Sequence, residues 1–190
     1  MNLTIARDDA EERPKERSVL EESDPKSRLF RVPYEHNLNF SGREDILIRI
    51  RNIFRDQHNH RFALHGLGGV GKTQIALQYA YKYREEYQHI FWLFATTREH
   101  ILADYRDIAG YIGAIIHPEL SSSDALTWVS ATRREMNNWL LIIDGLNDVR
   151  VIDGLLPPAN CGGHTLITTR TAHYVQRNSG RRFGSYGYDT

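Results

Sequence analysis

Residues 66–73 read Gly66-Leu-Gly-Gly-Val-Gly-Lys-Thr73 and match the complete phosphate-binding pattern G-x-x-x-x-G-K-[ST]. Glycines lack a Cβ atom, so they let the backbone curl until several N–H groups point at one anion. Lys72 brings a positive charge to the β- and γ-phosphates, and Thr73 brings a hydroxyl group for Mg²⁺. The stretch therefore predicts a binding site for a nucleoside triphosphate or its diphosphate product.

The sequence around this loop supplies the strand and the helix that such a loop needs on its two sides. Residues 62–65 are short and apolar, which predicts a buried strand. A glycine-rich turn that binds nothing is the alternative, but such a turn does not need the Lys-Thr pair at its end. After the loop, apolar residues recur at the three- and four-residue spacing of a helix with one apolar face: Ile75, Ala76, Tyr79, Ala80 and Tyr83.

The composition of the 190-residue chain fits one domain with a tail. The formal net charge of zero gives no sign of a general nucleic-acid surface, and no apolar run is long enough to cross a bilayer. The chain has a single cysteine, Cys161, so it has no internal disulfide. Because it also shows no signal peptide, we expect a reducing, cytoplasmic compartment, no nucleic-acid partner and no membrane.

Three segments follow from the distribution of charge and apolar residues. About half of residues 1–31 are charged, with both signs interleaved, which predicts a disordered arm, with a partner-binding arm as the alternative. Residues 32–170 are expected to form the nucleotide-binding domain. Residues 171–190 are polar and glycine-rich and are expected to be a flexible C-terminal tail.

Strands alternate with helices along the domain, which predicts an α/β fold with a mostly parallel sheet between helical layers. Ser41 or Gly42 is expected to cap the first helix, and Thr97 a later one. Ligands of such sheets bind at the carboxyl ends of the strands. The expected strands cover residues 62–65, 89–95, 139–144 and 164–169, and the expected helices, besides the one after the loop, cover 43–56, 97–115, 121–137 and part of 149–155.

Two further motifs fall at expected strand ends. Four apolar residues lead to Asp144, whose carboxylate would hold Mg²⁺ through its water shell. A strand-ending aspartate before a turn is the alternative. Thr168 and Thr169 lead to Arg170, which can reach the γ-phosphate or its vacated position. Here the alternative is an arginine exposed to solvent.

Together these motifs resemble the NB-ARC branch of the STAND class of P-loop ATPases, the nucleotide switches of NLR-like immune and cell-death receptors. The similarity runs from Asn39 to about Arg170. The Gly-Gly-Val within the loop is the most specific part. The matching stretches are Phe40-x-Gly42-Arg43-Glu44, the run from Ala63 to Ala76, Leu141-Ile-Ile-Asp144, and Leu166-Ile-Thr-Thr-Arg170.

The resemblance implies a three-layer P-loop NTPase core, in which the strand ending at Thr169 lies between the loop strand and the Asp144 strand. It implies ATP or ADP with Mg²⁺ as the ligand, and the guanine-reading Asn-Lys-x-Asp motif is absent from the sequence. Lys72, Asp144 and Arg170 would act on the phosphates, with Thr73 and Asp144 at the metal. Phe40, Gly42 and Arg43 would lie over the adenine and ribose, and Gly66, Gly68, Gly69, Val70, Gly71, Lys72, Thr73 and Gln74 would hold the phosphates.

Two departures from the family pattern limit the chemistry. Many members carry a second acidic residue directly after the metal aspartate, where it positions the attacking water, but here that place is Gly145. General-base assistance is worth about 10²–10⁴-fold, so we expect slow ATP hydrolysis at best. Asp148 lies near enough in sequence to compensate in part, although its direction is not fixed by the sequence.

The second departure lies after Arg170, where the family continues into a fifth strand, a small helical domain and a winged helix. Only about 20 residues remain here. We therefore expect four core strands with the fifth missing and an open edge beside the loop strand. Protein partners, or C-terminal domains outside this chain, would then complete the nucleotide site.

The sequence is compatible with three functions. The first is a signal-transduction switch that binds adenine nucleotide and hydrolyses it slowly or not at all, with oligomerisation on activation left open. The second is a remnant P-loop fold that acts through protein contacts. The third is a small P-loop kinase or ATPase, although the arginine-rich lid that a kinase needs has no counterpart after the loop.

Overall fold

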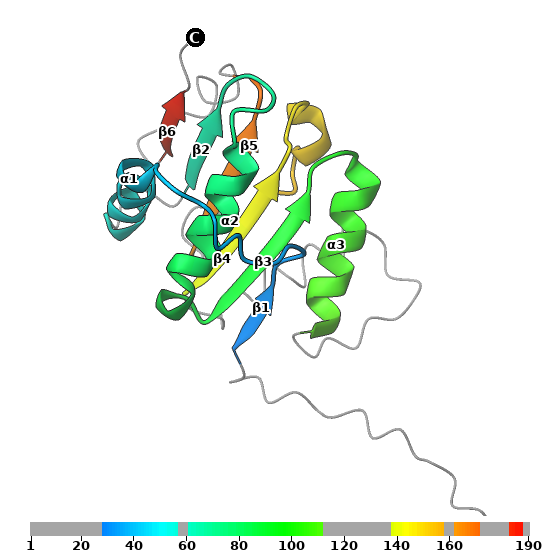
Figure 1. Ribbon diagram of the computed structural model, residues 1–190. Helices are drawn as coiled ribbons and strands as arrows, with labels where there is room; N and C mark the ends of the chain where they lie inside the picture. Colours follow the sequence, from blue (N-terminus) through cyan, green and yellow to red (C-terminus); the bar gives the residue numbers. More distant parts are fainter. Residues whose placement is uncertain (1–27, 57–60, 112–137, 158–161, 172–182, 188–190) are drawn as a thin grey trace, which may run out of the picture.

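One six-stranded sheet organises the protein in the computed structural model, which describes residues 28–56, 61–111, 138–157, 162–171 and 183–187. The strand order is β1-β3-β4-β5-β2-β6, and every neighbouring pair is parallel (Figure 1). The predicted α/β fold with a mostly parallel sheet is confirmed. The strands are β1 Leu29–Arg31, β2 Arg61–His65, β3 His89–Phe94, β4 Trp139–Asp144, β5 Gly163–Thr169 and β6 Phe183–Gly187.

Helices cover both faces of this sheet. Successive strand residues point to opposite faces, so each buried strand feeds two cores. In β4, Leu140 and Ile142 pack with α1 and α2, whereas Leu141 and Ile143 pack with α3 and the short helix η2. The helices are α1 Glu44–Arg55, α2 Lys72–Lys82, η1 Arg84–Glu86, α3 Arg98–Tyr111 and η2 Val149–Ile152.

The central strands meet in the order that the family resemblance implied. β5 lies between β2 and β4, with Ala63 opposite Ile167 and Ile142 opposite Leu166. Because all three strands run in the same direction, their carboxyl ends lie at one edge of the sheet. This edge carries the phosphate loop after β2, Asp144 at the end of β4 and Arg170 after β5.

The edge beside β2 is covered, so the expectation of four strands with the fifth missing is wrong. β6 pairs with β2 along its whole length, from Arg61 opposite Phe183 to His65 opposite Gly187. Arg49 of α1 donates through Nη2 to the carbonyl oxygen of Ser185 at 3.4 Å. Residues 183–187, for which the sequence predicts a flexible tail, therefore form an edge strand. Its glycine-rich sequence hides it, because glycine weakens the local preference for a strand.

The opposite edge also differs from expectation. Residues 29–31, for which the sequence predicts a disordered arm, form β1 and pair with residues 89–91 of β3. Arg28 forms an exposed ion pair with Glu85 beside this strand. Short length and charged neighbours conceal β1 in the sequence, and pairing with the buried β3 outweighs its weak intrinsic preference.

Helix boundaries follow the periodicity, but one predicted cap is wrong. α1 begins after Arg43, which has φ 62° and makes no side-chain cap, so neither Ser41 nor Gly42 caps this helix. Thr97 does cap α3, since its Oγ1 accepts from His100 N at 3.3 Å. The expected extension of α3 to residue 115, the helix over residues 121–137, and Cys161 lie outside the described residues.

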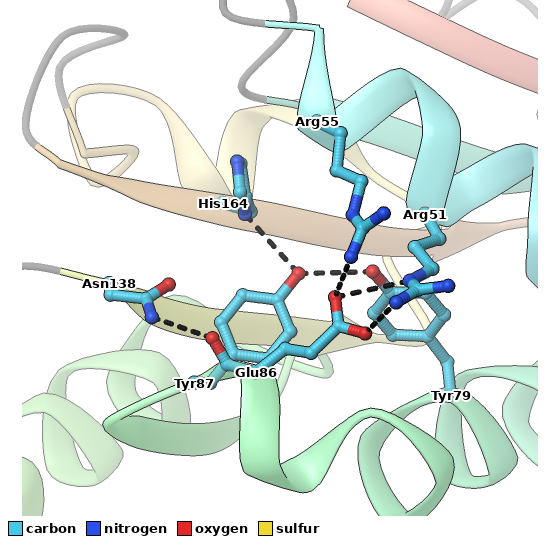
Figure 2. A network of polar contacts seen from close by, with 7 residues as sticks. All are labelled: Arg51, Arg55, Tyr79, Glu86, Tyr87, Asn138 and His164. Carbon is cyan, nitrogen blue, oxygen red and sulfur yellow. Dashed lines mark hydrogen bonds and ion pairs between the residues drawn. The ribbon is translucent and has the colours of Figure 1, made fainter.

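A polar network ties the helices together at the amino ends of the strands, away from the phosphate loop (Figure 2). The hydroxyl of Tyr87 lies 3.0 Å from the Tyr79 hydroxyl and 3.2 Å from Nδ1 of His164. Burial raises the pKa of both tyrosines well above the ordinary value. The network consists of Arg51 and Arg55 of α1, Tyr79 of α2, Glu86, Tyr87, Asn138 and His164.

Candidate functional site

The phosphate loop connects β2 to α2 in the way the sequence predicts. Gly69 and Gly71 have φ of 83° and 89°, a region that costs an ordinary side chain energy, so glycine is required at these turns of the loop. Gly71 directly precedes the first turn of α2. The N–H groups of that turn, with the positive end of the helix dipole, form an anion-binding end.

Lys72 is buried within the loop and bonded to it. Its Nζ donates to the carbonyl oxygens of Gly66 at 2.8 Å and Leu67 at 2.6 Å. Burial lowers the pKa of this ammonium group, the nearby charge of Arg170 lowers it further, and Asp144 acts in the opposite sense. A phosphate at the loop would supply the anionic partner that the two carbonyl groups replace only in part.

Asp144 forms the centre of a hydroxyl–carboxylate cluster. Its Oδ1 accepts from Thr73 Oγ1 at 2.8 Å and from Thr168 Oγ1 at 2.6 Å. The Thr168 hydroxyl in turn accepts from the backbone N–H of Gly145 at 2.8 Å. The structure thus brings the two predicted metal residues, Thr73 and Asp144, into direct contact.

Thr168 is a site residue that the sequence did not single out beyond its place before Arg170. It is buried, and its hydroxyl bridges the end of β4 to the end of β5. The available signal was a pair of threonines ending an otherwise apolar strand. Only the register of β5 beside β4 shows that the first of the two faces Asp144.

The donor set of this cluster fits Mg²⁺. Hydroxyl and carboxylate oxygens are its preferred protein ligands, and this ion keeps several waters and binds through one or two side chains plus nucleotide phosphates. Within the described ranges, no group of three or more His, Cys, Asp or Glu residues could hold a metal by itself. Thr73 and Asp144 would therefore share the ion with phosphate oxygens and water.

Arg170 extends over the phosphate loop from the end of β5. A Cβ atom added to Gly68 would lie 3.7 Å from the guanidinium carbon of Arg170, so the guanidinium rests on the backbone at this glycine. Arg170 is exposed. Its placement fits the predicted role at the γ-phosphate, and that role remains a prediction.

The segment expected to lie over the base runs beside the same helix. Asn37 Nδ2 donates to Gln74 Oε1 at 3.3 Å, which fastens the segment to the first turn of α2. Phe40 is half-buried against the core under α1 and α2. Gly42 and Arg43 follow with positive φ and lead into α1. The residues predicted for base and phosphates therefore lie at adjacent elements, while their contacts with a nucleotide remain a prediction.

Asp148, the acidic residue that follows Gly145 most closely, is paired with Arg150. Both carboxylate oxygens of Asp148 accept from the guanidinium of Arg150, at distances of 2.7 to 3.0 Å, and the backbone N–H of Arg150 adds a further bond. These bonds lower the pKa of Asp148 to about 2. A carboxylate so paired is a weak proton acceptor, because catalytic bases work best with a pKa near the operating pH.

The chain is similar in sequence to one curated protein and in fold to a solved structure. A nucleotide-binding leucine-rich repeat (NLR)-like protein from Hyaloscypha variabilis is 29% identical over 130 residues, which cover 65% of this chain and 13% of that protein. The structure of Cdc6p from Pyrobaculum aerophilum superposes with a TM-score of 0.59 at 15% identity, covering 82% of this chain and 48% of that one. Together with the phosphate loop, these similarities support an NB-ARC-like P-loop NTPase domain. The likeness to Cdc6p concerns the fold alone.

The chain spans about an eighth of the length of the NLR-like protein and about half of the length of Cdc6p. No protein-family model matches the sequence. Among the helices that the structure describes, none has the length and apolar character needed to cross a membrane. Nucleotide binding through the P-loop is the function that the similarities support at this level.

Proposed function

We propose that the domain binds ADP or ATP with Mg²⁺ and serves as the nucleotide-binding module of an NLR-like signalling switch, with slow or no hydrolysis. The observation that carries this proposal is the convergence of Lys72, Thr73 and Asp144 at the carboxyl-end edge of the sheet, where the Thr73 hydroxyl donates to the Asp144 carboxylate at 2.8 Å. Similarity to an NLR-like protein supports the signalling role. Adenine as the base rests on the family resemblance.

Slow hydrolysis follows from the absence of a suitable base at the end of β4. Gly145 cannot orient water, and Asp148 is held by Arg150 at a pKa of about 2. The site therefore supports binding better than turnover. A switch needs such slowness, because a bound triphosphate must persist long enough to hold the active conformation.

Arg170 gives the site a means of distinguishing the two nucleotides. Its guanidinium rests on the loop at Gly68, where an additional phosphate would offer a charge-assisted bond. A ligand shifts a conformational equilibrium only by its difference in affinity for the two states. The γ-phosphate would supply that difference through Arg170.

Isothermal titration of the whole chain with ADP and Mg²⁺ tests the binding. We expect Lys72→Ala to weaken binding by about 10–100-fold, since a hydrogen bond to a charged group is worth about 1.5–3 kcal/mol. Lys82→Ala is the matched control, because Lys82 lies in the last turn of the same helix and pairs with Glu44 at the surface. Equally poor binding by wild type and Lys72→Ala would instead support a remnant fold that acts through protein contacts.

Single-turnover phosphate release distinguishes the switch from an enzyme. Rates of about 1–100 s⁻¹, which are typical of kinases, would contradict the switch and favour a small P-loop kinase or ATPase. We expect rates far below this range, because the described site offers no free carboxylate to the attacking water.

A further inference from the structure

The segment that joins β1 to α1 lies along one face of α2 (Figure 1). Residues 34–40 of this segment form a strap over the helix. The strap contacts Gln74, Gln78 and Tyr81 of α2, which are spaced four and three positions apart. Residues at this spacing are neighbours on a helix surface. The strap therefore follows a single row of side chains on the helix that begins at the phosphate loop.

The strap and α2 run in opposite directions. Near the carboxyl end of the helix, the Tyr81 hydroxyl donates to the carbonyl oxygen of Tyr34 at 2.8 Å. The ring of His36 stacks on the ring of Tyr81, with centroids 4.6 Å apart and planes 13° from parallel. His36 Nε2 also lies 3.1 Å from Gln78 Oε1, one turn closer to the phosphate loop. Each step along the strap thus brings the chain nearer to the loop.

Asn37 joins the strap to the base segment, the residues Phe40, Gly42 and Arg43 that are expected to lie over the base. Its Nδ2 donates to Gln74 Oε1 at 3.3 Å, in the first turn of α2. Its Oδ1 accepts from Asn39 N at 3.1 Å, and its carbonyl oxygen accepts from Phe40 N at 3.1 Å. One residue therefore closes the turn that leads into the base segment and ties this turn to the helix.

This arrangement matters because a nucleotide must be met at two places a fixed distance apart. The phosphates bind at the amino end of α2, directly after Gly71. The same helix holds the strap, and the strap leads to the base segment. A base segment that is already in place does not have to be ordered when the nucleotide binds. If only a fraction of molecules holds the competent arrangement, the apparent affinity falls by that fraction.

The contacts of His36 and Asn37 lie at the surface, where they contribute little to the hydrophobic core. Both residues are exposed, as is Gln74. Glu35 and Leu38 flank the pair in the strap and are exposed as well, and Leu38 is 84% exposed. Among the described residues, no hydrogen bond or ring contact joins the side chains of these flanking residues to α2. The strap is therefore held to the helix by every part except the Glu35 and Leu38 side chains.

We propose that His36 and Asn37 are positioning residues, which hold the base segment at a fixed place relative to the phosphate loop through their contacts with α2. The inference rests on the proposed nucleotide binding and deepens it. The strap determines the share of the affinity that comes from the base and ribose. The loop determines the share that comes from the phosphates, and this share does not depend on the strap.

MgADP and magnesium pyrophosphate separate the two shares, because pyrophosphate has neither base nor ribose. In the whole chain carrying both His36→Ala and Asn37→Ala, we expect titration calorimetry to show MgADP binding about 5–20-fold more weakly than to wild type. Pyrophosphate should bind within about 2-fold of wild type. An unchanged affinity for MgADP, or an equal loss for both ligands, would overturn the positioning role while nucleotide binding stands. A wild type that binds neither ligand would overturn the proposed function as well.

The flanking residues supply the matched control. Glu35→Ala with Leu38→Ala also replaces two exposed side chains of the strap, but it removes no contact with α2 that the described structure contains. We expect this control to bind both ligands as wild type does. A loss equal to that of the His36 and Asn37 variant would show that the strap acts by some means other than its contacts with the helix, against the proposal.

A double-mutant cycle tests whether Asn37 acts through Gln74. Asn37→Ala should weaken MgADP binding in the wild-type background and have little further effect in the Gln74→Ala background, because the contact is already lost there. The full loss in both backgrounds would contradict the coupling.

Amide hydrogen exchange at Phe40 reports the turn without any nucleotide. The Phe40 N–H donates to the carbonyl oxygen of Asn37, and Gln74→Ala leaves both of these groups in place. We expect this amide to exchange at least about 3-fold faster in Gln74→Ala than in wild type, since the turn loses its tie to the helix. In wild type, MgADP should slow the exchange more than pyrophosphate does, because coupling between sites is reciprocal. Exchange that is indifferent to Gln74→Ala would show that the turn holds itself in place and would overturn the role of α2.

Discussion

The hydroxyl of Thr168 determines where the carboxylate of Asp144 points. The Thr168 hydroxyl accepts a hydrogen bond from Gly145 N and donates one to Asp144 Oδ1. Because the Gly145 N–H occupies one side of the oxygen, the hydroxyl proton points to Asp144. Both groups are buried, and a carboxylate fixed by two hydroxyls has little freedom to turn away from a metal. This is a positioning role, because Thr168 acts through Asp144.

Replacing Thr168 by valine removes the hydroxyl and keeps the shape. We expect MgADP to bind about 10-fold more weakly, since a hydrogen bond to a charged group is worth about 1.5–3 kcal/mol, while ADP with EDTA present binds as it does to wild type. Titration calorimetry with and without Mg²⁺ separates the contribution of the metal to the affinity from that of ADP itself. Thr169→Val is the matched control, because the Thr169 hydroxyl contacts Thr171 instead. A loss that is equal with and without Mg²⁺ would contradict the positioning role.

Gly145 limits hydrolysis, so introducing an acid there should increase it. Gly145 has φ of 77°, a Cβ atom added to it would meet nothing within 4 Å, and aspartate and asparagine tolerate this region better than other side chains. We expect Gly145→Asp to cost about 1 kcal/mol of stability and to raise phosphate release by up to about 10²-fold. Gly145→Asn bears the same strain without a base, and it should remain as slow as wild type. Equal rates for the two variants would remove base catalysis from the explanation.

At the scale of single residues, the sequence predicts those functional groups that belong to a short local motif. Lys72 and Thr73 follow from one loop, and Asp144 follows from its apolar run. The role of Thr168 depends on the register between two strands that are 24 residues apart at the contact, so no local pattern contains it. The engagement of Asp148 by Arg150 is local, but a two-residue spacing alone does not say which way either side chain turns.

Among the elements, β6 ends at Gly187, a position that leaves no room for a side chain. A Cβ atom on Gly187 would lie 2.3 Å from Cε1 of His65, the residue that precedes the phosphate loop. We expect Gly187→Ala to reduce the free energy of unfolding by about 1–3 kcal/mol through overpacking. Adding His65→Ala should restore most of the loss, because it removes the ring. Urea denaturation of the four chains of this cycle measures the coupling, and simple additivity of the two changes would argue against the contact.

The elements that were predicted and those that were missed differ in where their stability comes from. β3 and β4 are continuous apolar runs, and α3 carries a regular apolar face, so their own sequences contain the signal. β1 and β6 are edge strands of three and five residues with charged or glycine-rich sequences. Their pairing depends on the neighbouring strand, which is a tertiary effect that propensity does not capture.

Over the whole molecule, the phosphate loop with Asp144 and the polar network around Tyr87 lie at opposite ends of the sheet. The carboxyl ends of β2, β4 and β5 carry the phosphate site, whereas the network around Tyr87 joins α1, α2 and β5 at the amino ends (Figure 2). Stability changes made in the network should therefore leave nucleotide affinity alone. This separation is a consequence of the parallel sheet, in which all strands begin at one edge and end at the other.

Tyr87→Phe tests the separation and its pH dependence together. Removing this hydroxyl leaves Tyr79 and His164 without a partner they contact in the wild type, so we expect a loss of about 1–3 kcal/mol at neutral pH. Burial raises the pKa of Tyr87 in the folded state, whereas the unfolded chain ionises near pH 10, so the stability contributed by the neutral phenol is complete below about pH 10 and declines above it.

Phenylalanine has no such proton, and the gap between wild type and Tyr87→Phe should therefore narrow by about 1.4 kcal/mol per pH unit once the pH exceeds about 10. Urea denaturation of both chains at neutral pH and near pH 11 measures this convergence. The affinity for MgADP at neutral pH should be equal in the two chains, because the network and Asp144 lie at opposite ends of the strands. A loss of both stability and affinity in Tyr87→Phe would show that the two ends of the sheet are coupled. A difference in the free energy of unfolding that stays constant with pH would show that Tyr87 ionises as readily in the folded protein as in the unfolded chain.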